Sequence, residues 1–586
     1  MTSNYAENIK NIEQILQSHN DLTPIVQNNY YMNLGYYHNQ LRNYITAIQW
    51  FKKIKPMDYS TYMSIAAIYT SFDLPQSFPY TEKCLELRFT TNVAYDLACN
   101  YTKAFRFDKA YGLYETILLF DRKYINAYNN RSEILNCMFR QTEALDGYTA
   151  AYDLDNTRLD ILSNIIMSTY YIPKYIHSDR EKYLSMFDKH MQIDKIDQLK
   201  HSKRIDGKKI RIGYIGYDFN KQSHPITCFV KHILDNHSSA FTIFCYQVST
   251  TQSNVFQGNN GSSLYTQKME HITTRNLSNI TDKEASMVIR NDDVDILVEL
   301  MNHTAGNRLK ILAYKPAPIQ ISYCAFPGTT GMAAIDYKIL DKTTNTQSTD
   351  KSNTEKILCM PNGFHCFVPT YEFPPIIHSN RNTINLCCFN NVKKINRNVI
   401  SVWVHILRLV PTAQLYLRYS QYSSSYVREH VLHQFRMISE EYGYDLKIQR
   451  IHFIGCKTDY KDVLELFSFM DIFLDTFPYT GTTVICEALT MNVPVITLMG
   501  KHVHERVGAS LLHSIGLDEC VASDSSEYVN AVVELCKNPL RLKELKNSIP
   551  LRMKNSILGN PSIFIKEYET IMYSAIEEYN NNISLV

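Results

Sequence analysis

Three kinds of residue in the N-terminal part of the chain return at one fixed interval. The pairs are Ala110 and Ala144, Tyr114 and Tyr148, and Asp121 and Asp155, and the spacing is the same in all three. A period of about 34 residues is typical of two short helices that cross where the side chains are small. Each helix pair has one apolar stripe that only a neighbouring pair can cover, so the pairs stack into a solenoid. The interval therefore predicts an α-helical repeat array.

The same order of small and then aromatic residues occurs upstream, between residues 33 and 51. The period and the small residues resemble the tetratricopeptide repeat, with about four units in residues 28–160. The segment 74–79 breaks the period, which predicts that the second unit is degenerate. We assign residues 1–205 to this helical domain. Its concave groove either recruits protein segments or braces the domain that follows, and the sequence leaves both readings open.

After a polar stretch at residues 201–209, the pattern changes to short apolar runs separated by helix-like segments. The first runs are residues 210–215, 241–248, 295–300 and 319–324. A second set begins at residues 384–389, after the polar, proline-bearing segment 369–383, and continues through AQLYL, RIHFI, DIFLD and PVITL. Such runs are typical of parallel strands covered on both faces by helices. The sequence therefore predicts two Rossmann-like lobes facing a cleft, residues 206–378 and residues 379–586 with a terminal helix.

The composition argues against several kinds of partner. The formal charge of the 586 residues is only +2, whereas proteins that bind nucleic acid or membrane surfaces have a basic excess. No apolar run approaches the roughly 20 residues that span a bilayer, and the N-terminus lacks the apolar core of a secretory signal. The 14 cysteines are scattered through apolar segments and are predicted to be buried thiols. We therefore expect a cytoplasmic protein, with the nucleus as a second compatible location, that binds neither nucleic acid nor membrane.

Polar residues follow two strands of the second predicted lobe. Asn390–Ile395 follows its first strand, and Thr476–Thr483 follows DIFLD and leads into a helix that carries Glu487. A Gly-Thr-Thr turn at a helix start offers N–H groups, hydroxyls and the positive end of the helix dipole, which suit a diphosphate. A lysine from the neighbouring strand end adds a full charge, and Glu487 can accept hydrogen bonds from ribose hydroxyls. Each feature taken singly also fits a helix cap or a surface residue.

Five longer strings are more specific than these single features. They are DILVELMNHTAGNRL (295–309), KPAPIQ (315–320), PGTTGMAAIDY (327–337), DTFPYTGTT with CEAL (475–489) and HVHERVGASLL (502–512). In this order they resemble the O-GlcNAc transferase / SPINDLY family, which joins tetratricopeptide repeats to a two-lobed GT-B catalytic region. The resemblance implies an α-helical tetratricopeptide-repeat solenoid followed by an α/β GT-B fold. It also implies a hexosyltransferase that moves a sugar from a nucleotide-diphosphate donor to Ser/Thr hydroxyls of proteins.

The resemblance further implies roles for single residues. His224 matches a histidine that faces the donor sugar and the acceptor hydroxyl and is often proposed as a base. Lys394 matches the lysine that neutralises the diphosphate, and His303 matches a histidine in a turn that lines the active site. These three are the catalytic candidates. The donor-binding candidates are Thr304 in the same turn, Pro327, Gly328 and Thr329 in a loop that cups the sugar, Asn391, Thr482, Thr483, Glu487, His502 and His504.

The implied chemistry needs neither a cofactor nor a metal ion. An inverting transfer requires in-line attack on the anomeric carbon and stabilisation of the departing diphosphate, which Lys394 and the helix start can supply. His224 can accept the hydroxyl proton near neutral pH. Asp293 and Asp295 spell the Asp-x-Asp of many metal-dependent glycosyltransferases, but they precede a buried strand, away from the ligand-binding strand ends. The string HVHE at residues 502–505 has ligand residue types without a second ligand cluster, so we expect no metal.

Three positions depart from the family pattern. Asn302 replaces the glycine of a Gly-His-Thr turn, and Thr482 stands where O-GlcNAc transferases have a histidine. Val463 stands where many relatives have a histidine that stacks on uracil. The departures favour the SPINDLY branch, whose plant members use GDP-fucose. The donor nevertheless stays open between GDP-fucose and UDP-GlcNAc.

Two other functions are compatible with the sequence. The first is a repeat scaffold that has lost transferase activity and only binds partners or nucleotide. The joint presence of His224, Lys394, Thr483 and Glu487 argues against it. The second is transfer to a glycan or small molecule, which would leave the repeat groove without a use. The leading hypothesis instead names acceptor proteins as partners, bound by their Ser/Thr segments and by the groove, and a homodimer is compatible with the array.

Overall fold

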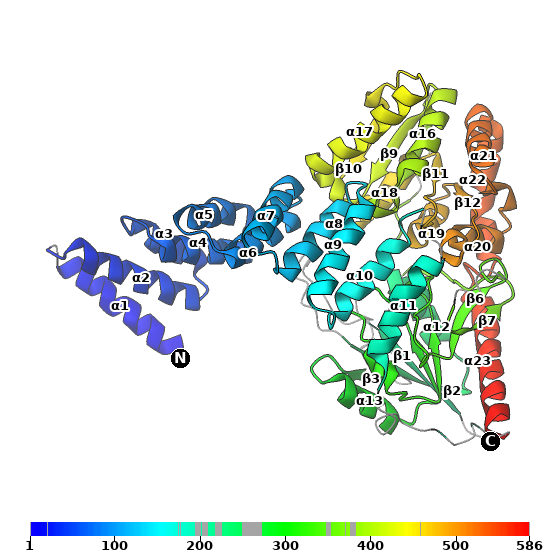
Figure 1. Cartoon of the computed structure of the whole chain (residues 1–586), viewed down its shortest axis with the longest axis horizontal. Coiled ribbons are helices and arrows are strands. Elements are labelled where there is room, and N and C mark those ends of the chain that lie inside the picture. Colours follow the sequence, from blue (N-terminus) through cyan, green and yellow to red (C-terminus); the bar gives the residue numbers. More distant parts are fainter. Residues whose placement is uncertain are drawn as a thin grey trace. The chain divides into compact units, whose positions relative to one another are not determined.

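The computed structural model describes residues 2–19, 21–173, 175, 177–193, 201, 205, 209–216, 225–248, 272–346, 353–369, 371–375, 383–456 and 459–584. The chain forms two compact units, Met1–Ile134 and Leu135–Val586. The first is built from helices alone, whereas the second contains two sheets with helices around them (Figure 1). Within the described ranges, every helix is too short or too polar to pass through a lipid bilayer.

The first unit consists of consecutive helices that pack in pairs. Its helices are α1 (Thr2–Ser18), α2 (Pro24–Gln40), α3 (Tyr44–Lys53), α4 (Tyr59–Phe72), α5 (Leu74–Leu87), α6 (Thr91–Lys103) and α7 (Phe107–Phe120), and α8 (Ile125–Asn136) crosses into the second unit. The pairs are α2 with α3, α4 with α5, and α6 with α7. The break in the period at residues 74–79 does not interrupt a helix, because α5 begins with a proline in its first turn and continues through Pro79.

Small residues allow the paired helices to approach each other closely. A Cβ atom placed on Gly35 of α2 would lie 2.6 Å from the ring of Phe51 in α3, so a larger residue would displace that ring. Ala47, Ile48 and Phe51 are buried in the same cluster. The sequence predicts such packing of a small residue against an aromatic one, and this contact shows it.

The interval of the repeat recurs in the backbone as well as in the side chains. The four apolar members of the repeated pairs are all buried. Phe105 and Phe139, separated by the same interval, have left-handed φ angles of 58° and 61°. In both turns the next N–H bonds a carbonyl further back in the preceding helix, Arg106 to Tyr101 and Arg140 to Leu135. This closure ends the first helix of a pair and directs the chain into the second. The predicted helical repeat is confirmed.

Three further helices precede the sheets in the second unit. They are α9 (Gln141–Leu154), α10 (Leu159–Thr169) and α11 (His177–Met191), and α10 packs on both of the others. The sequence places a domain boundary at residue 205, where helices give way to sheets. These three helices nevertheless belong to the same compact unit as the sheets. The assignment of residues 1–205 to one separate domain therefore stays a prediction.

The first sheet has seven strands in the order β3-β2-β1-β4-β5-β6-β7, and all of its pairings are parallel. The strands are β1 (Ile210–Gly216), β2 (Phe241–Gln247), β3 (Ile272–Asn276), β4 (Ile296–Glu299), β5 (Ile319–Ser322), β6 (Tyr337–Asp341) and β7 (Lys356–Met360). The helices of this lobe include α12 (Pro225–Asn236), α13 (Asp282–Asn291) and α14 (Lys310–Ala313). Strands β3, β6 and β7 are additional to those expected from the sequence.

The second sheet has six parallel strands in the order β10-β9-β8-β11-β12-β13. The strands are β8 (Asn385–Cys388), β9 (Gln414–Arg418), β10 (Ile451–Ile454), β11 (Ile472–Leu474), β12 (Val495–Leu498) and β13 (Val521–Ala522). Its helices include α16 (Arg397–Leu409), α17 (Ser425–Glu441), α18 (Tyr460–Glu465), α19 (Thr483–Thr490), α20 (Val507–Ser514), α21 (Ser525–Lys537) and α22 (Pro539–Lys554). Cys387 and Cys388 of β8 are buried free thiols, as predicted, whereas the prediction is wrong for Cys359 and Cys456, which are exposed.

In each sheet the strand that comes first in the sequence lies inside the sheet, with strands paired on both of its sides. β1 pairs with β2 and β4, and β8 pairs with β9 and β11, so each lobe has the switch point at which α/β proteins bind ligands. The last helix, α23 (Pro561–Ser584), follows the second sheet but packs on α12 and β7 of the first lobe. There Glu569 pairs with Nδ1 of His237 at 2.9 Å. The two Rossmann-like lobes confirm the predicted GT-B-like fold.

Candidate active site between the two lobes

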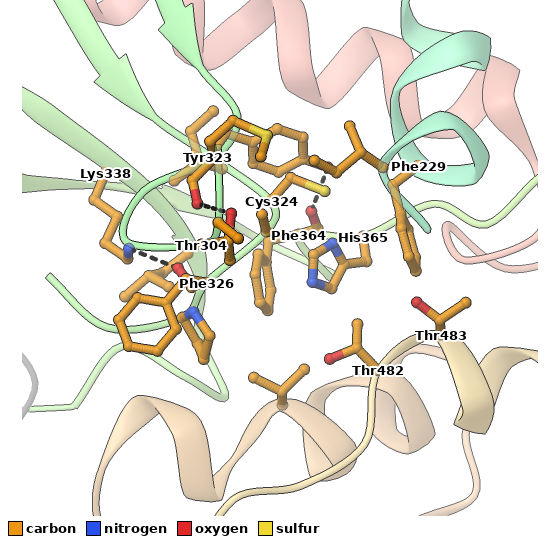
Figure 2. Close-up of a pocket in the computed structure, with 18 of the residues that line it drawn as sticks. Phe229, Thr304, Tyr323, Cys324, Phe326, Lys338, Phe364, His365, Thr482 and Thr483 are labelled. Atoms are coloured by element: carbon orange, nitrogen blue, oxygen red, sulfur yellow. Dashed lines mark hydrogen bonds between the residues drawn. The ribbon is translucent and has the colours of Figure 1, made fainter. Parts of the chain in front are cut away.

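A cavity of about 470 Å³ is lined by residues of both lobes. Of the predicted site residues, Thr304 and Pro327 line it from the first lobe, and Thr482 and Thr483 line it from the second (Figure 2). Much of the remaining wall is aromatic, with contributions from Phe229, Tyr323, Phe326 and Phe364. Such a cavity, mostly apolar with a few convergent polar groups, is typical of a small-molecule site.

The loop after β11 is held in place by a buried carboxylate. One oxygen of Asp475 accepts hydrogen bonds from the Gly481 N–H at 2.7 Å and the Asn390 side chain at 3.0 Å, and the other accepts from the Thr497 hydroxyl at 2.7 Å. Burial raises the pKa of Asp475, while these bonds and the charge of Lys394 act in the opposite direction. Asp475 therefore fixes the turn that leads into α19.

Lys394 lies beside that turn, at the end of a short 3-10 helix (Val392–Lys394) that follows β8. Its Nζ donates to the Thr480 carbonyl at 2.7 Å and lies 4.3 Å from the centre of the Tyr479 ring. Desolvation lowers the pKa of Lys394 to about 8, and the Asp475 carboxylate offsets part of this effect. The ammonium group is thus held in a poorly solvated place, where an anionic ligand would stabilise its charge.

The start of α19 offers hydrogen-bond donors next to this lysine. The N–H groups of Ile485 and Cys486 bond the Thr482 carbonyl, whereas those of Thr483 and Val484 have no acceptor among the described residues. Free N–H groups at a helix start, together with the helix dipole, favour an anion. Asn391 supports the lysine turn instead: its side chain accepts from the Lys393 N–H at 3.1 Å and donates to the Tyr419 hydroxyl at 3.2 Å.

Glu487 lies on the buried side of α19, where two tyrosines contact it. The hydroxyls of Tyr371 (3.1 Å) and Tyr460 both donate to Oε1 of Glu487. Burial raises the pKa of Glu487 to about 7, although the two hydroxyls favour its charged form. Because both tyrosines bond the same oxygen, the other oxygen remains for a ligand.

The first-lobe loop that carries Pro327, Gly328 and Thr329 is anchored from behind. The Thr329 hydroxyl donates to buried Glu355 at 2.6 Å, and the Gly328 carbonyl accepts from Nζ of buried Lys338 at 2.6 Å. A Cβ on Gly328 would lie 2.5 Å from the Tyr170 hydroxyl, so this position has no room for a side chain. Pro327 therefore faces the cavity, whereas the Thr329 hydroxyl is bonded to Glu355.

His303 is enclosed between this loop and helix α10. Its Nδ1 lies 3.1 Å from the Ser163 hydroxyl of α10, and its Nε2 lies 3.1 Å from the Thr330 carbonyl. Burial lowers the pKa of His303 to about 3, so the ring is neutral at physiological pH. The carbonyl requires a donor, which places the proton on Nε2 and leaves Nδ1 as the acceptor. With both nitrogens bonded, this geometry favours a positioning role for His303 over direct proton transfer.

Asn302, which stands where the resemblance implies a glycine, adopts a left-handed turn. Its φ angle is 49°, a left-handed conformation that asparagine tolerates better than most residues. Its side chain donates to the Gly328 carbonyl at 2.9 Å and accepts from the His303 N–H at 2.7 Å. The substitution thus joins two of the predicted site loops.

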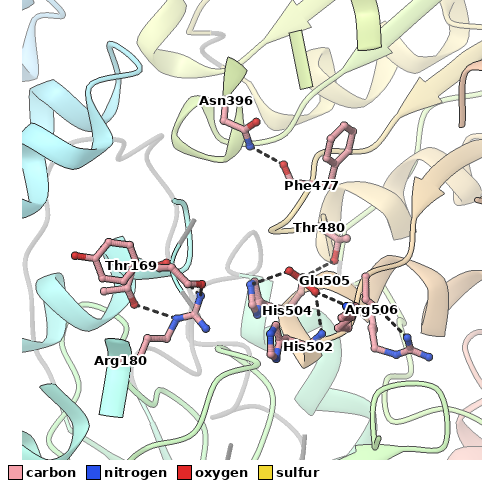
Figure 3. A network of polar contacts seen from close by, with 12 residues as sticks. Thr169, Arg180, Asn396, Phe477, Thr480, His502, His504, Glu505 and Arg506 are labelled. Atoms are coloured by element: carbon pink, nitrogen blue, oxygen red, sulfur yellow. Dashed lines mark hydrogen bonds and ion pairs between the residues drawn. The ribbon is translucent and has the colours of Figure 1, made fainter. Parts of the chain in front are cut away.

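His504 contacts the second-lobe loop through its carbonyl and Tyr170 through its ring, and Figure 3 shows it beside Thr480, His502 and Glu505. Its carbonyl accepts from both the N–H and the hydroxyl of Thr480, each at 3.1 Å. Its ring is buried edge-to-face against Tyr170 at 4.8 Å, and the Arg180 guanidinium lies 4.2 Å from the centre of the same tyrosine ring. His502 lies next to it, with the two imidazoles stacked at 6.0 Å.

Of the predicted catalytic residues, His224 lies outside the described residues. Lys394 and His303 are described, and neither lines the cavity wall itself. Asp295 of the Asp-x-Asp pair accepts the Arg211 N–H at 2.8 Å, at the start of β4. Within the described residues no group of three or more His, Cys, Asp or Glu side chains is arranged to hold a metal ion.

A family model described as glycosyl transferase family 41 matches residues 177–379 and 377–568, which together exceed half of the chain. The chain belongs to glycosyl transferase family 41. The family assignment inferred from the five strings is confirmed.

Several relatives carry names that match this family. A Solanum lycopersicum protein named probable UDP-N-acetylglucosamine–peptide N-acetylglucosaminyltransferase SPINDLY is 32% identical over 383 residues, which cover 64% of this chain and 40% of that protein. The Arabidopsis thaliana relative named SEC is 28% identical over 359 residues, covering 58% of this chain and 34% of that protein. The chain thus spans less than half the length of these relatives.

A solved structure of a Thermobaculum terrenum O-GlcNAc transferase mutant matches with a TM-score of 0.78 and 22% identity. The match covers 89% of this chain and 98% of that one. At this level of identity the similarity concerns the fold.

In this family 41 chain, the structure adds residues that the sequence does not reveal as parts of the site. Asp475, Glu355 and Lys338 hold the two loops from behind, and His365 forms part of the cavity wall. Asp475 is the first residue of the string DTFPYTGTT and comes directly after a buried strand, and this position could have identified it as a site residue. Lys338 lies inside a buried strand, and His365 follows β7 in a segment without a motif.

Proposed function

We propose that this chain transfers a sugar from a nucleotide-diphosphate donor to Ser/Thr hydroxyls of other proteins, with inversion and without a metal ion. Membership of family 41 supports the reaction class. The observation that carries the proposal is the bond of Lys394 to the turn before α19, because Thr482 and Thr483 at the end of that turn line a cavity shared by both lobes.

Lys394 and the α19 start supply the charge that the leaving group needs. The departing diphosphate gains negative charge as the glycosidic bond breaks, and donors already in place stabilise it without reorganising. The N–H groups of Thr483 and Val484 supply hydrogen bonds, and the lysine supplies a full positive charge. These groups do the work that a divalent cation does in other transferases, which is why we infer a metal-independent reaction.

The donor's diphosphate binds at this turn, with its sugar and its ribose on opposite sides. The sugar enters the cavity past Thr304 and Pro327, and the ribose lies toward Glu487, whose second oxygen can accept a hydroxyl. The proton of the acceptor hydroxyl passes to His224 in this proposal, as the family resemblance implies. His303 keeps the sugar loop in place through the Thr330 carbonyl.

The acceptor is a protein segment in this proposal, and the repeat array recruits it. The relatives named SPINDLY and SEC carry names that describe peptide acceptors. An array of helix pairs presents an extended concave surface, which suits an extended polypeptide.

Direct titration tests the proposal and identifies the donor. Purified protein is titrated with UDP-GlcNAc, GDP-fucose, UDP and GDP, each with and without EDTA. We expect one donor and its nucleotide to bind with affinity that EDTA does not change. Loss of binding in EDTA would refute the metal-independent mechanism, and absence of binding by all four compounds would favour a scaffold that has lost the reaction.

A further inference from the structure

The cavity wall contains a buried histidine whose ring nitrogens have no hydrogen-bond partner among the described residues. His365 is 3% exposed and lines the cavity, and its Nδ1 is enclosed by protein without a partner. Nε2 is not enclosed in this way and bonds none of the described residues, so it is left for a polar group inside the cavity.

The aromatic surroundings of His365 explain why no protein group bonds it. Its ring lies 4.0 Å from the ring centre of Phe364 and 4.9 Å from that of Phe229. These neighbours fix the orientation of the imidazole without offering a donor or acceptor. Figure 2 shows the ring on the first-lobe wall, directed across the cavity toward Thr482 and Thr483.

The chemistry of the imidazole limits the kind of ligand group that fits. Burial, and to a smaller extent neighbouring His232, lowers the pKa of His365 to about 3, so the ring is uncharged. With Nδ1 enclosed, Nε2 is the nitrogen that can reach the cavity. A neutral imidazole nitrogen either donates or accepts, and a hydroxyl satisfies it in both cases. In the proposed function the diphosphate is bound at Lys394 and the ribose at Glu487, which leaves the sugar as the hydroxyl-bearing part for this wall.

We propose that Nε2 of His365 hydrogen-bonds a hydroxyl of the donor sugar and makes His365 a residue that selects the sugar. This proposal rests on the function proposed above. The neighbours of the histidine are aromatic and offer it no hydrogen bond, so a sugar that lacks the matching hydroxyl leaves the imidazole unpaired. Sites of this kind reject such analogues strongly.

The test compares the affinity for the intact donor with that for the bare nucleotide. His365→Phe replaces the ring with one that the aromatic neighbours accept but that cannot form a hydrogen bond. His365→Gln restores a donor and an acceptor. Isothermal titration uses whichever of UDP-GlcNAc and GDP-fucose binds the wild type, together with the corresponding diphosphate. His232→Phe is the matched control, because His232 is equally buried but does not line the cavity.

We expect His365→Phe to weaken donor binding about tenfold, equivalent to about 1.4 kcal/mol, while the affinity for the bare diphosphate stays unchanged. His365→Gln should recover part of the loss, and His232→Phe should bind both compounds as the wild type does. Equal affinity of His365→Phe and wild type for the donor would overturn the proposal, and so would a change confined to the KM of the acceptor. A wild type that binds neither donor would instead overturn the proposed function, and this inference with it.

Discussion

Replacement of Lys394 by methionine separates its catalytic role from its effect on stability. Methionine has nearly the length of the lysine stem, so the contact with the Tyr479 ring can be kept while the charge is lost. Removal of one preorganised donor to a developing anion typically costs a factor of about 10²–10³ in kcat. We expect that loss for transfer, together with weaker binding of the nucleotide diphosphate.

The same substitution should not destabilise the ligand-free protein. The pKa of Lys394 is lowered from 10.5 to about 8, which corresponds to an upper limit of about 3 kcal/mol against the charged form. The lost bond to the Thr480 carbonyl offsets about 1 kcal/mol of the gain. The free energy of unfolding at pH 7 should therefore rise by about 1–2 kcal/mol. Between pH 8 and 10.5 the unfolded wild type holds more protons than the folded wild type, so wild-type stability increases with pH and the difference shrinks.

Urea unfolding at pH 7 and pH 10 and initial-rate kinetics at pH 7 measure the two effects. Lys546→Met is the control, because this lysine also bonds a carbonyl, that of Met470 at 3.0 Å, at the opposite end of β11, and it pairs in addition with Asp471 at 3.2 Å, so its loss should lower stability. The control should keep its kcat. Turnover of Lys394→Met within tenfold of the wild type would refute the role of the lysine at the diphosphate. A loss of stability equal to the loss in the control would refute the argument from desolvation.

Three further substitutions test the other walls of the site. Glu487→Gln should weaken donor binding about tenfold, as measured by titration. It should also raise the free energy of unfolding relative to wild type, and more at pH 8 than at pH 5, because burial penalises a carboxyl with a pKa of about 7 only when it is charged. Urea unfolding at both pH values measures this difference. Gly328→Ala should lower the free energy of unfolding by about 1–3 kcal/mol, whereas Gly112→Ala, where a Cβ meets nothing within 4 Å, should not. Ser163→Ala should cost about 1–3 kcal/mol, because it leaves Nδ1 of buried His303 unpaired, and unchanged stability would refute that bond.

The periodic parts of the fold could be predicted from the sequence. The repeat interval of the helices and the apolar runs of the sheets both reflect burial, which leaves a local pattern. Two of the strands that escaped prediction, β3 and β6, lack that pattern. β3 reads ITTRN and is mostly exposed, and β6 carries Lys338 and Asp341 inside a fully buried strand.

The candidate site was predictable where a loop contains its own signal. The Gly-Thr-Thr turn and Lys394 follow strand ends in sequence, and the structure places them side by side through the Thr480 carbonyl. The supporting contacts could not be predicted, because they join residues that are distant in sequence. His303 depends on Ser163, 140 residues away, and Glu487 depends on Tyr371, 116 residues away. No periodicity or short motif encodes such pairs.

These distant contacts also bear on whether the helices recruit acceptor proteins or support the catalytic lobes. Ser163 of α10 contacts His303. Directly after α10, Tyr170 packs on His504 and Tyr171 packs on Tyr479, both in the second lobe. In α11, Asp188 accepts the Ala333 N–H of the first lobe at 2.9 Å. Helices α10 and α11 therefore brace the site.

A truncation that removes residues 1–200 would destroy this bracing and would abolish transfer whatever the acceptor. The compact units divide at residue 134, within α8, so removal of residues 1–124 is the cut that keeps the site whole. If the first unit recruits acceptors, that shorter deletion raises the KM for protein acceptors and leaves donor binding and transfer to short peptides intact. Equal loss on proteins and peptides would instead extend the bracing role to the first unit.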